Sequence, residues 1–395
     1  MLRRGSHERL HRTLISRAEW LLDPNVSFLN HGSFGAVPRA VLQAQRLLQE
    51  QMERNPTEFL TCELPKALRA TAEKLTRLLG GVGSDYVFTD NATAGCNTIL
   101  NSIRFAPGDE ILTTDHGYPA VLLAARRAAD RTGAIIVQAK VPFPLQDEAQ
   151  VIAAVAQRLS YRTRLVILDH VTSPTALLFP VHRLTALCQE AGARVLVDGA
   201  HAPAMLTLDI PSIKADWYVG NCHKWLMAPK GSAFIWAAPA RQGEIQPLVT
   251  SHGSGQGFHA EFDWVGTRDP TAWLSVPAAI DWHIAAGGAA LRQRNAALVE
   301  TAAQELATQW KTEVGSPTQD SVAMKTVRLP FSGAATQEAA LDFRALLFRD
   351  HRIDVAVVAF AGSLWTRISA QAYNSLPEYR LFAGVVRSRR NPPRA

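Results

Sequence analysis

The sequence is poor in the residues and runs that would indicate a disulfide framework, a zinc site or a membrane span. Its 395 residues include only four cysteines, and none of them has CxxC spacing. Scattered cysteines argue against a disulfide scaffold and against a structural zinc site. No apolar run approaches the roughly 20 residues of a membrane-spanning helix, and no apolar segment follows the basic start as in a signal peptide. We therefore expect a cytoplasmic protein that binds neither membrane nor metal.

Internal repeats, low-complexity segments and basic runs interleaved with aromatic residues are also missing. The formal net charge of +6 comes largely from arginines near the two ends of the chain. Basic tails can meet nucleic acid or anionic lipid, but solvated termini are the better explanation because there is no recognisable binding motif. The apolar fraction of 47% is sufficient for a large core. A metabolic enzyme with no nucleic-acid partner is the better interpretation.

The chain is rich in short apolar runs that alternate with amphipathic segments. This alternation is typical of an α/β protein with a mostly parallel, doubly wound sheet. After about residue 289 the pattern changes to helices and fewer strands, which indicates a smaller C-terminal domain. We predict a basic arm over 1–21, a large domain over 22–275, and a small domain with a connecting helix over 276–395. The strands expected in the large domain lie at 86–90, 110–114, 135–139, 165–169, 194–198, 216–220 and 230–236.

Two short motifs place a carboxylate and an amine after neighbouring predicted strands. Asp198 ends one apolar run, and Lys224 follows the next. Ligands of open α/β sheets bind at the carboxyl ends of the strands, so both groups can reach one small molecule. Pyridoxal phosphate (PLP) needs an amine that forms a Schiff base with its aldehyde and an anion beside its pyridine nitrogen. An isolated pair at a surface would not need the nearby His201, His223 and Trp225, so we assign Lys224 and Asp198 to PLP.

Five motifs carry a resemblance to a known family: VDGAHAP, GNCHKW, FLNHGSFG, DHVTSPTALLFP and VGTRDP. They resemble the fold-type I, class V aminotransferase superfamily of PLP-dependent enzymes, and within it the isopenicillin N epimerase-like branch. The resemblance covers residues 22–379. It implies a large domain with a mostly parallel seven-stranded doubly wound sheet and a smaller C-terminal α+β domain.

The resemblance also implies where the cofactor's phosphate and ring would lie. Ala92 and Thr93 match the phosphate-holding turn at the start of a helix, where N–H groups are unpaired; a plain N-cap by Thr93 is the alternative. Tyr118 matches the aromatic residue that stacks on the ring, and His116 is the second candidate. Gly117 and Pro119 depart from the family's pattern in this loop.

Further contacts with the cofactor follow from the same motifs. Thr172 or Ser173 offers a hydroxyl to the phenolic oxygen, although either could instead be an ordinary helix cap. His201 would tune the same oxygen, and His223 would bind the phosphate. In similar enzymes the threonine that corresponds to Thr267 contacts the phosphate of the neighbouring subunit's cofactor. The resemblance therefore implies a homodimer with shared sites.

Substrate contacts are expected from two other segments. The guanidinium of Arg367 suits bidentate capture of a carboxylate, and it occupies the position of the family's carboxylate-binding arginine. The loop that contains Asn30, His31 and Ser33 reaches the substrate side in similar enzymes, although a turn that bonds to itself is the simpler explanation. Relatives of the epimerase type carry threonine in place of His31.

The predicted reaction starts with removal of a Cα proton of an amino-acid-type substrate by Lys224. Epimerisation needs a second acid on the opposite face, for which Tyr118 and His116 are the candidates. An epimerase or racemase is the leading prediction, with a C–S lyase or an aminotransferase as alternatives and a binding protein with a vestigial pocket as the non-enzyme alternative. A cysteine desulfurase is rejected, because residues 350–366 contain no cysteine to serve as its thiolate.

Overall fold

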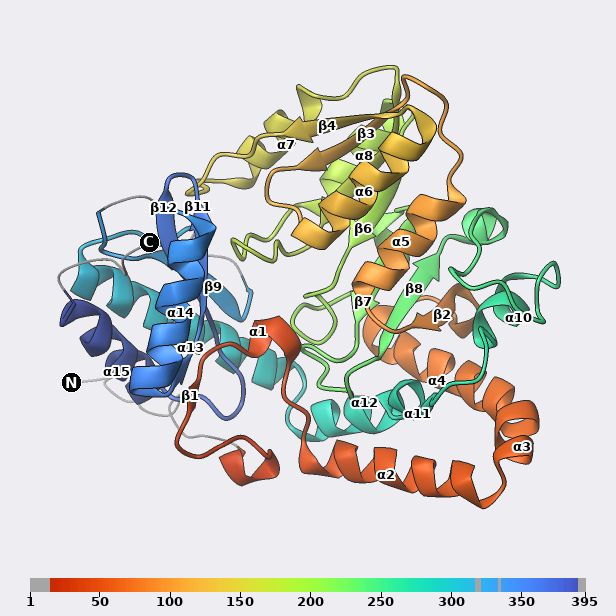
Figure 1. Ribbon diagram of the computed structural model, residues 1–395, viewed down its shortest axis with the longest axis horizontal. Coiled ribbons are helices and arrows are strands. Elements are labelled where there is room, and N and C mark those ends of the chain that lie inside the picture. The colour runs from red at the N-terminus through yellow and green to blue at the C-terminus, as the bar shows by residue number, and fades with distance from the viewer. Residues whose placement is uncertain (1–14, 317–320, 333–334, 390–395) are drawn as a thin grey trace, which may run out of the picture.

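The structure is a computed structural model that describes residues 15–316, 321–332 and 335–389. Most of the predicted basic arm therefore lies outside the described residues. The described chain forms a larger body around a central sheet and a smaller body of C-terminal elements beside it (Figure 1). This α/β architecture confirms the predicted fold class.

The larger body is built on a seven-stranded sheet with the order β2-β8-β7-β6-β5-β3-β4. Every neighbouring pair is parallel except the two pairs that involve β8. The strands are β2 (Tyr86–Thr89), β3 (Glu110–Thr114), β4 (Ile135–Ala139), β5 (Thr163–Asp169), β6 (Arg194–Asp198), β7 (Trp217–Asn221) and β8 (Ala233–Ala237). All seven coincide with predicted runs, and the central parallel strands β3, β5 and β6 are almost continuously buried, as apolar runs predict.

Both faces of this sheet are covered by helices. Along β5, Leu165 and Ile167 pack with the apolar sides of α5 and α6, whereas Val166 and Leu168 pack with α7 and α8. Alternation of this kind is what a doubly wound sheet requires, since successive side chains of a strand point to opposite faces. The covering helices are α4 (Leu64–Leu79), α5 (Ala92–Ser102), α6 (Pro119–Thr132), α7 (Glu148–Ala156) and α8 (Val181–Glu190).

The remaining helices of the larger body are mostly short. They are α1 (His31–Phe34), α2 (Arg39–Arg54), α3 (Pro56–Glu58), α9 (Ile210–Ile213), α10 (Phe258–Asp263), α11 (Thr271–Leu274) and α12 (Val276–Ala285), with a π-helical turn at Phe59–Glu63 and 3₁₀ turns at Arg17–Glu19, Gly83–Asp85 and Pro239–Glu244. None of the helices in the described part of the chain is long and apolar enough to cross a bilayer.

The smaller body is a three-stranded antiparallel sheet, in the order β11-β12-β9, packed against three helices. Its elements are α13 (Ala289–Trp310), β9 (Met324–Arg328), α14 (Gln337–His351), β10 (Ile353–Asp354), β11 (Ala356–Phe360), β12 (Ser363–Ser369) and α15 (Leu376–Arg387). The N-terminal β1 (Ser27–Phe28) pairs in parallel with β10. Residues close to the start of the chain are therefore tied to the C-terminal body, although the predicted boundaries group them with the large domain.

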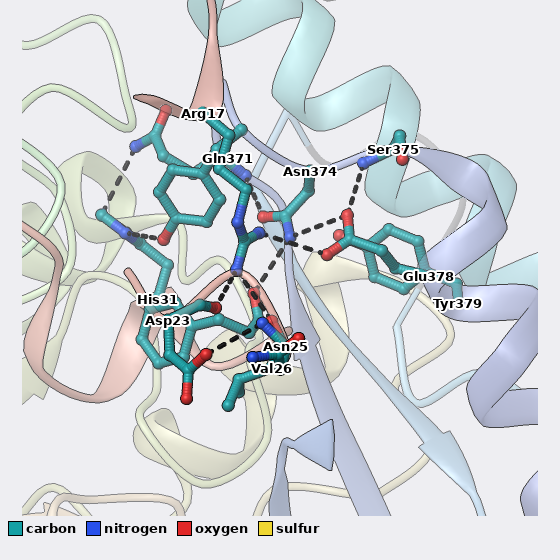
Figure 2. Close-up of polar contacts among 12 residues, drawn as sticks. Arg17, Asp23, Asn25, Val26, His31, Gln371, Asn374, Ser375, Glu378 and Tyr379 are labelled. Carbon is teal, nitrogen blue, oxygen red and sulfur yellow. Dashed lines mark hydrogen bonds and ion pairs between the residues drawn. The ribbon is translucent and has the colours of Figure 1, made fainter. Parts of the chain in front are cut away.

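Polar contacts hold the N-terminal segment against the loop before α15 (Figure 2). Arg17 donates to the carbonyl of Val26 at 2.8 Å and pairs with Glu378 at 3.5 Å. The amide of Asn374 donates to the carbonyl of Phe28 at 2.9 Å. These bonds satisfy backbone groups of a segment that has almost no secondary structure of its own.

Gly35, at the end of α1, allows this segment to approach the loop after β7 very closely. Its φ is +72°, and a Cβ built there would lie 2.3 Å from the carbonyl oxygen of His223 and 2.7 Å from that of Lys224. Backbone atoms cannot move aside cheaply, so only glycine fits. Because α1 touches this loop directly, the N-terminal segment helps to hold it in place.

We expect Gly35→Ala to lower the free energy of unfolding more than Gly255→Ala does. Both glycines have positive φ, and strain of that kind costs of order 1–3 kcal/mol. Nothing lies within 4 Å of a Cβ at Gly255, so this variant measures the backbone strain alone. Urea denaturation of the two variants makes the comparison. Equal midpoints would show that the close approach of α1 to the loop does not contribute.

Candidate active site

A cavity of about 480 Å³ opens at the carboxyl ends of β5, β6 and β7. Ends of parallel strands meet at one edge of the sheet, so residues that follow different strands converge there. The lining comes from the end of α1, the start of α5 and the loops after the central strands. Its residues are Ser33, Phe34, Asp90, Asn91, Ala92, Thr93, Tyr118, Asp169, Val171, Ser173, Asp198, Ala200, His201, Asn221, His223, Lys224 and Gly231.

Two carboxylates lie side by side at the base of the cavity. Asp198 ends β6 and Asp169 ends β5, and the two residues are partners in the strand register. Burial raises the pKa of both, and the charge of Asp198 raises that of Asp169 further. The N–H of Ala200 donates to Asp198 at 3.0 Å and stabilises its anion. Protonation is therefore favoured within this pair, more strongly at Asp169 than at Asp198.

Lys224 is buried in the same cavity. Its Nζ lies 3.1 Å from His201 Nε2 and 6.0 Å from the centre of the Tyr118 ring. Burial, followed by the nearby positive charge of Arg367, lowers the pKa of Lys224 to about 7, although Asp198 and Asp169 oppose this. A large fraction of the amine is therefore uncharged and nucleophilic at neutral pH.

The start of α5 forms the anion-binding end of the cavity. Asn91, not Thr93, caps this helix, and its side chain accepts from the N–H of Ala94 at 2.9 Å. The N–H of Ala92 donates to the side chain of Asn221 at 2.8 Å. Among residues 15–316, 321–332 and 335–389, none bonds to the N–H or hydroxyl of Thr93. These two donors, with the positive end of the helix dipole, suit a phosphate.

His223 lies beside this helix start with one nitrogen directed at the backbone. Its Nδ1 is 3.0 Å from the carbonyl oxygen of Ser232, so Nδ1 carries the proton and donates. Burial, followed in smaller part by the charges of Lys224 and Lys230, lowers the pKa of His223 to about 4. A bound dianion would reverse that effect, because an opposite charge favours the imidazolium.

Arg367 lies behind the cavity wall and holds two of its lining residues. It donates to the hydroxyl of Ser33 at 3.0 Å and to both the carbonyl and hydroxyl oxygens of Ser173. Its Nε is buried and has no partner within the described residues. The guanidinium therefore lies directly behind Ser33 and Ser173, which line the cavity. A carboxylate that replaced the two serines as partners could bind it.

The structure does not bring Thr172 to the cavity. Its hydroxyl is fully buried, lies 2.7 Å from that of Thr175, and accepts from the N–H of Leu177 at 2.8 Å. The side chain closes its own loop, so it neither contacts the cavity nor caps a helix. Ser173, the other candidate of this pair, is the one that lines the cavity.

His116 is also directed away from the cavity, so the prediction of a catalytic role for it has to be corrected. Its Nδ1 lies 2.7 Å from the hydroxyl of Thr175 and its Nε2 lies 3.1 Å from the carbonyl oxygen of Val141. The ring is fully buried, with its centre 4.5 Å from that of Phe360. The chain turns at Gly117, which directs His116 into the core and Tyr118 into the cavity.

Two of the three predicted substrate residues on α1 are engaged elsewhere. His31 is fully buried, with Nδ1 2.7 Å from the hydroxyl of Tyr373 and Nε2 3.1 Å from the carbonyl oxygen of Lys224. Asn30 donates to Asp354 at 3.1 Å and accepts from Ser33 at 2.6 Å. Only Ser33 lines the cavity, and we correct the prediction that His31 and Asn30 touch substrate. His31 joins the C-terminal body to the loop of Lys224, and Asn30 joins that body to Ser33.

Thr267 is exposed and lies outside the cavity lining of this chain. The adjacent Arg268 pairs with Asp90, which does line the cavity, and lies 4.1 Å from the centre of the Trp273 ring.

Three residues that line the cavity were not predicted from the sequence as site residues: Asp169, Asn221 and Phe34. Asp169 ends its strand as Asp198 does, and Asn221 lies within the GNCHKW motif, so both carried a usable signal.

No cysteine lines the cavity, and all four cysteines belong to the described residues. Cys96, Cys188 and Cys222 are buried, and burial raises the pKa of each thiol. Cys62 is exposed, in the π-helical turn before α4. A thiolate nucleophile is therefore not available at this site.

The groups that converge here fit PLP. The cavity places an uncharged amine, a buried carboxylate with an acceptor position free among the described residues, an aromatic ring and an unpaired helix start around one space. These are the partners that an aldehyde, a pyridine nitrogen, a planar ring and a phosphate require. Fold and site together define the class as a fold-type I PLP-dependent enzyme.

Comparison with known proteins gives the family. Residues 29–355 match the model of the aminotransferase class-V family. The chain is 34% identical to isopenicillin N epimerase of Streptomyces clavuligerus, over 94% of this chain and 96% of that protein. It is 30% identical to a probable chloroplastic L-cysteine desulfhydrase of Arabidopsis thaliana, over 92% of this chain and 83% of that protein. The chain therefore belongs to the class-V aminotransferase family of PLP-dependent enzymes, as the sequence predicted.

Solved structures share the same fold. A variant of C-DES with glycine covalently linked to its PLP cofactor superposes with a TM-score of 0.78 at 21% identity, covering 94% of this chain and 99% of that one. The cysteine desulfurase CsdA of Escherichia coli gives a TM-score of 0.74 at 18% identity, covering 94% and 96%. At these identities the likeness concerns the fold alone.

We expect His116→Leu to lower the free energy of unfolding by about 1–3 kcal/mol, because the carbonyl of Val141 loses its buried donor. PLP uptake should not change. His182→Leu, at an exposed position on α8, is the control and should be neutral. Urea denaturation and cofactor titration give the two readouts. A variant with normal stability and abolished turnover would instead return His116 to the catalytic machinery.

Proposed function

We propose that this protein is a PLP-dependent epimerase that inverts the Cα centre of an amino-acid-type substrate. The observation that carries the proposal is that Lys224 and Tyr118 line the same cavity as Asp198, with Lys224 Nζ 6.0 Å from the centre of the Tyr118 ring. An inversion requires a base and an acid on opposite sides of the reacting carbon. These two side chains are the pair within the described cavity that can supply them.

Each end of the cofactor has a partner in this cavity. Lys224 would hold the aldehyde carbon, Asp198 would hold the pyridine nitrogen in its protonated state, and Tyr118 would stack on the ring. Thr93 and His223 would hold the phosphate at the start of α5. When bound, PLP supplies an electron sink that makes the substrate's Cα–H bond acidic.

Lys224 acts as the base in this proposal. Its lowered pKa, about 7, leaves the amine ready to accept a proton at neutral pH. Arg367 would bind the substrate carboxylate after Ser33 and Ser173 give up their bonds to it. This contact fixes the Cα–H bond toward Lys224, and orientation of that kind accounts for a large part of enzymatic rate.

Tyr118 would return a proton from the other face. His116, the second candidate from the sequence, is excluded because its ring is buried among aromatic residues. Tyr118 is 39% exposed, so its hydroxyl can exchange its proton with solvent. Inversion then depends on one hydroxyl group, while proton removal by Lys224 does not.

A C–S lyase is the second candidate, and the likeness to L-cysteine desulfhydrases favours it. Elimination also starts with proton removal by Lys224, and it then expels a sulfur group from Cβ without an acid on the opposite face. A desulfurase that carries persulfide on its own thiolate is disfavoured by the lack of cysteine in the cavity. An aminotransferase would require the proton to move to another carbon.

Tyr118→Phe separates these reactions. In deuterated water with L-amino acids, we expect the variant to keep Cα deuterium exchange within about tenfold of the wild-type rate, while inversion falls by about 10²–10⁴, the usual contribution of a general acid. Chiral chromatography and mass spectrometry measure the two rates. Lys224→Ala should abolish both, and serves as the blank.

Other products would overturn the epimerase proposal in favour of its alternatives. Pyruvate with released sulfide, unchanged in Tyr118→Phe, would establish a lyase, and a keto acid with amino-group transfer would establish an aminotransferase. A wild-type protein that takes up no PLP would overturn the enzyme proposal altogether.

We further propose a homodimer in which Thr267 reaches the partner's phosphate site. Support comes from the exposed position of Thr267 beside Arg268 and from exposed apolar side chains on the same body, such as Phe34 and Leu47. Thr267→Ala is expected to weaken PLP binding by about fivefold to tenfold, the value of about one hydrogen bond, without changing the sedimentation coefficient. A monomeric wild type with undiminished affinity in the variant would contradict the shared site.

A further inference from the structure

Trp225 directly follows Lys224 and has a polar contact that the proposed reaction does not use. Its indole Nε1 lies 3.3 Å from Nδ1 of His201, whose Nε2 lies 3.1 Å from Lys224 Nζ. The three side chains thus form a line from the core to the cavity. Trp225 is buried and rigid, because it packs in an apolar cluster with Met205, Val171, Ala176, Val322, Ala323 and Met324.

This line determines which nitrogen of His201 carries the proton. An indole N–H can only donate, so the Nδ1 that faces it must be unprotonated. A neutral imidazole then carries its proton on Nε2, directed at Lys224. His201 stays neutral because burial, followed by the positive charge of Lys224, lowers its pKa well below the usual value.

The tautomer of His201 in turn discriminates between the two states of Lys224. An Nε2–H group at 3.1 Å can donate to the lone pair of an uncharged amine. An ammonium has no lone pair and would direct its own hydrogens at that Nε2–H. The contact therefore stabilises the amine relative to the ammonium, in the same direction as burial does.

Charged groups on other elements act on Lys224 in both directions. Arg367 on β12 disfavours the ammonium, whereas Asp198 on β6 and Asp169 on β5 favour it. His223, beside Lys224 in the same loop, is neutral because its pKa is lowered to about 4. Because these nearby charges oppose one another, a donor in direct contact with the amine adds to the effect of burial, which is the largest cause.

We propose that Trp225 is a positioning residue that fixes the tautomer of His201 and thereby keeps the amine of Lys224 uncharged. The role of this amine in catalysis rests on the proposed function, but its charge state in the free protein does not. The contacts from Trp225 through His201 to Lys224 add to the effect of burial, so the lysine can stay nucleophilic in a cavity that also contains a carboxylate. It gives Trp225 a chemical role in addition to its packing.

The test measures the pKa of Lys224 in the cofactor-free protein by trace acetylation. Acetic anhydride reacts only with the uncharged amine, so the labelling rate of the Lys224 peptide follows its titration. In Trp225→Phe the ring packing is largely kept and the N–H is lost, so His201 can move its proton to Nδ1 and accept from the ammonium. We expect the midpoint to rise by about one pH unit, the effect of one hydrogen bond to a charged group.

This rise corresponds to a labelling rate about fivefold lower at pH 7, if the wild-type midpoint is near 7. Trp236→Phe is the matched control, because Trp236 is also buried and its Nε1 bonds to no described residue. Its midpoint should equal that of the wild type. Equal midpoints in all three proteins, or equal shifts in both variants, would overturn the proposal.

A second measurement needs no change at Trp225. In wild-type protein labelled with ¹⁵N-histidine, His201 should show a protonated Nε2 and an unprotonated Nδ1, with its signals assigned by their loss in His201→Gln. The opposite tautomer would overturn the proposal even if Trp225→Phe failed to fold. A protein that passes both tests and takes up no PLP would instead contradict the proposed function.

Discussion

The chemistry of this protein depends on an amine and a carboxylate that are buried in one cavity without neutralising each other. Burial and the charge of Arg367 lower the pKa of Lys224 to about 7, and its contact with His201 acts in the same direction. Burial raises the pKa of Asp198, whereas the N–H of Ala200 and the charge of Lys224 favour its charged form. If the two simply formed an ion pair, the amine would be an ammonium and could not act as a nucleophile.

Parts of the chain that are distant in sequence hold this cavity together. His31 lies between the hydroxyl of Tyr373 and the backbone carbonyl of Lys224, so it joins the C-terminal body to the loop that carries the lysine. The contacts of Arg17 and Asn374 reinforce the same junction (Figure 2). The N-terminal segment thus connects the C-terminal body to the loop that carries the lysine.

Several expectations from the sequence were right for reasons that are local. Buried parallel strands are apolar along their whole length, so their positions could be recognised one by one, and the residue after each strand lies at the same sheet edge. This logic brought Asp198 and Lys224 to one cavity, whereas Thr93 was predicted from the family resemblance. Applied to every strand, it would also have included Asp169, which follows β5 in the same way.

The sequence alone determined the fold class, the family and the identity of the central lysine and aspartate, because strand periodicity and short motifs are local properties. Only the tertiary structure decided which way each polar side chain of a loop points. His116 and Tyr118 are two residues apart, yet one packs in the aromatic core and the other lines the cavity. Burial and the supply of partners from distant segments decide between such neighbours, since a polar group in the interior must find a hydrogen bond wherever the fold provides one.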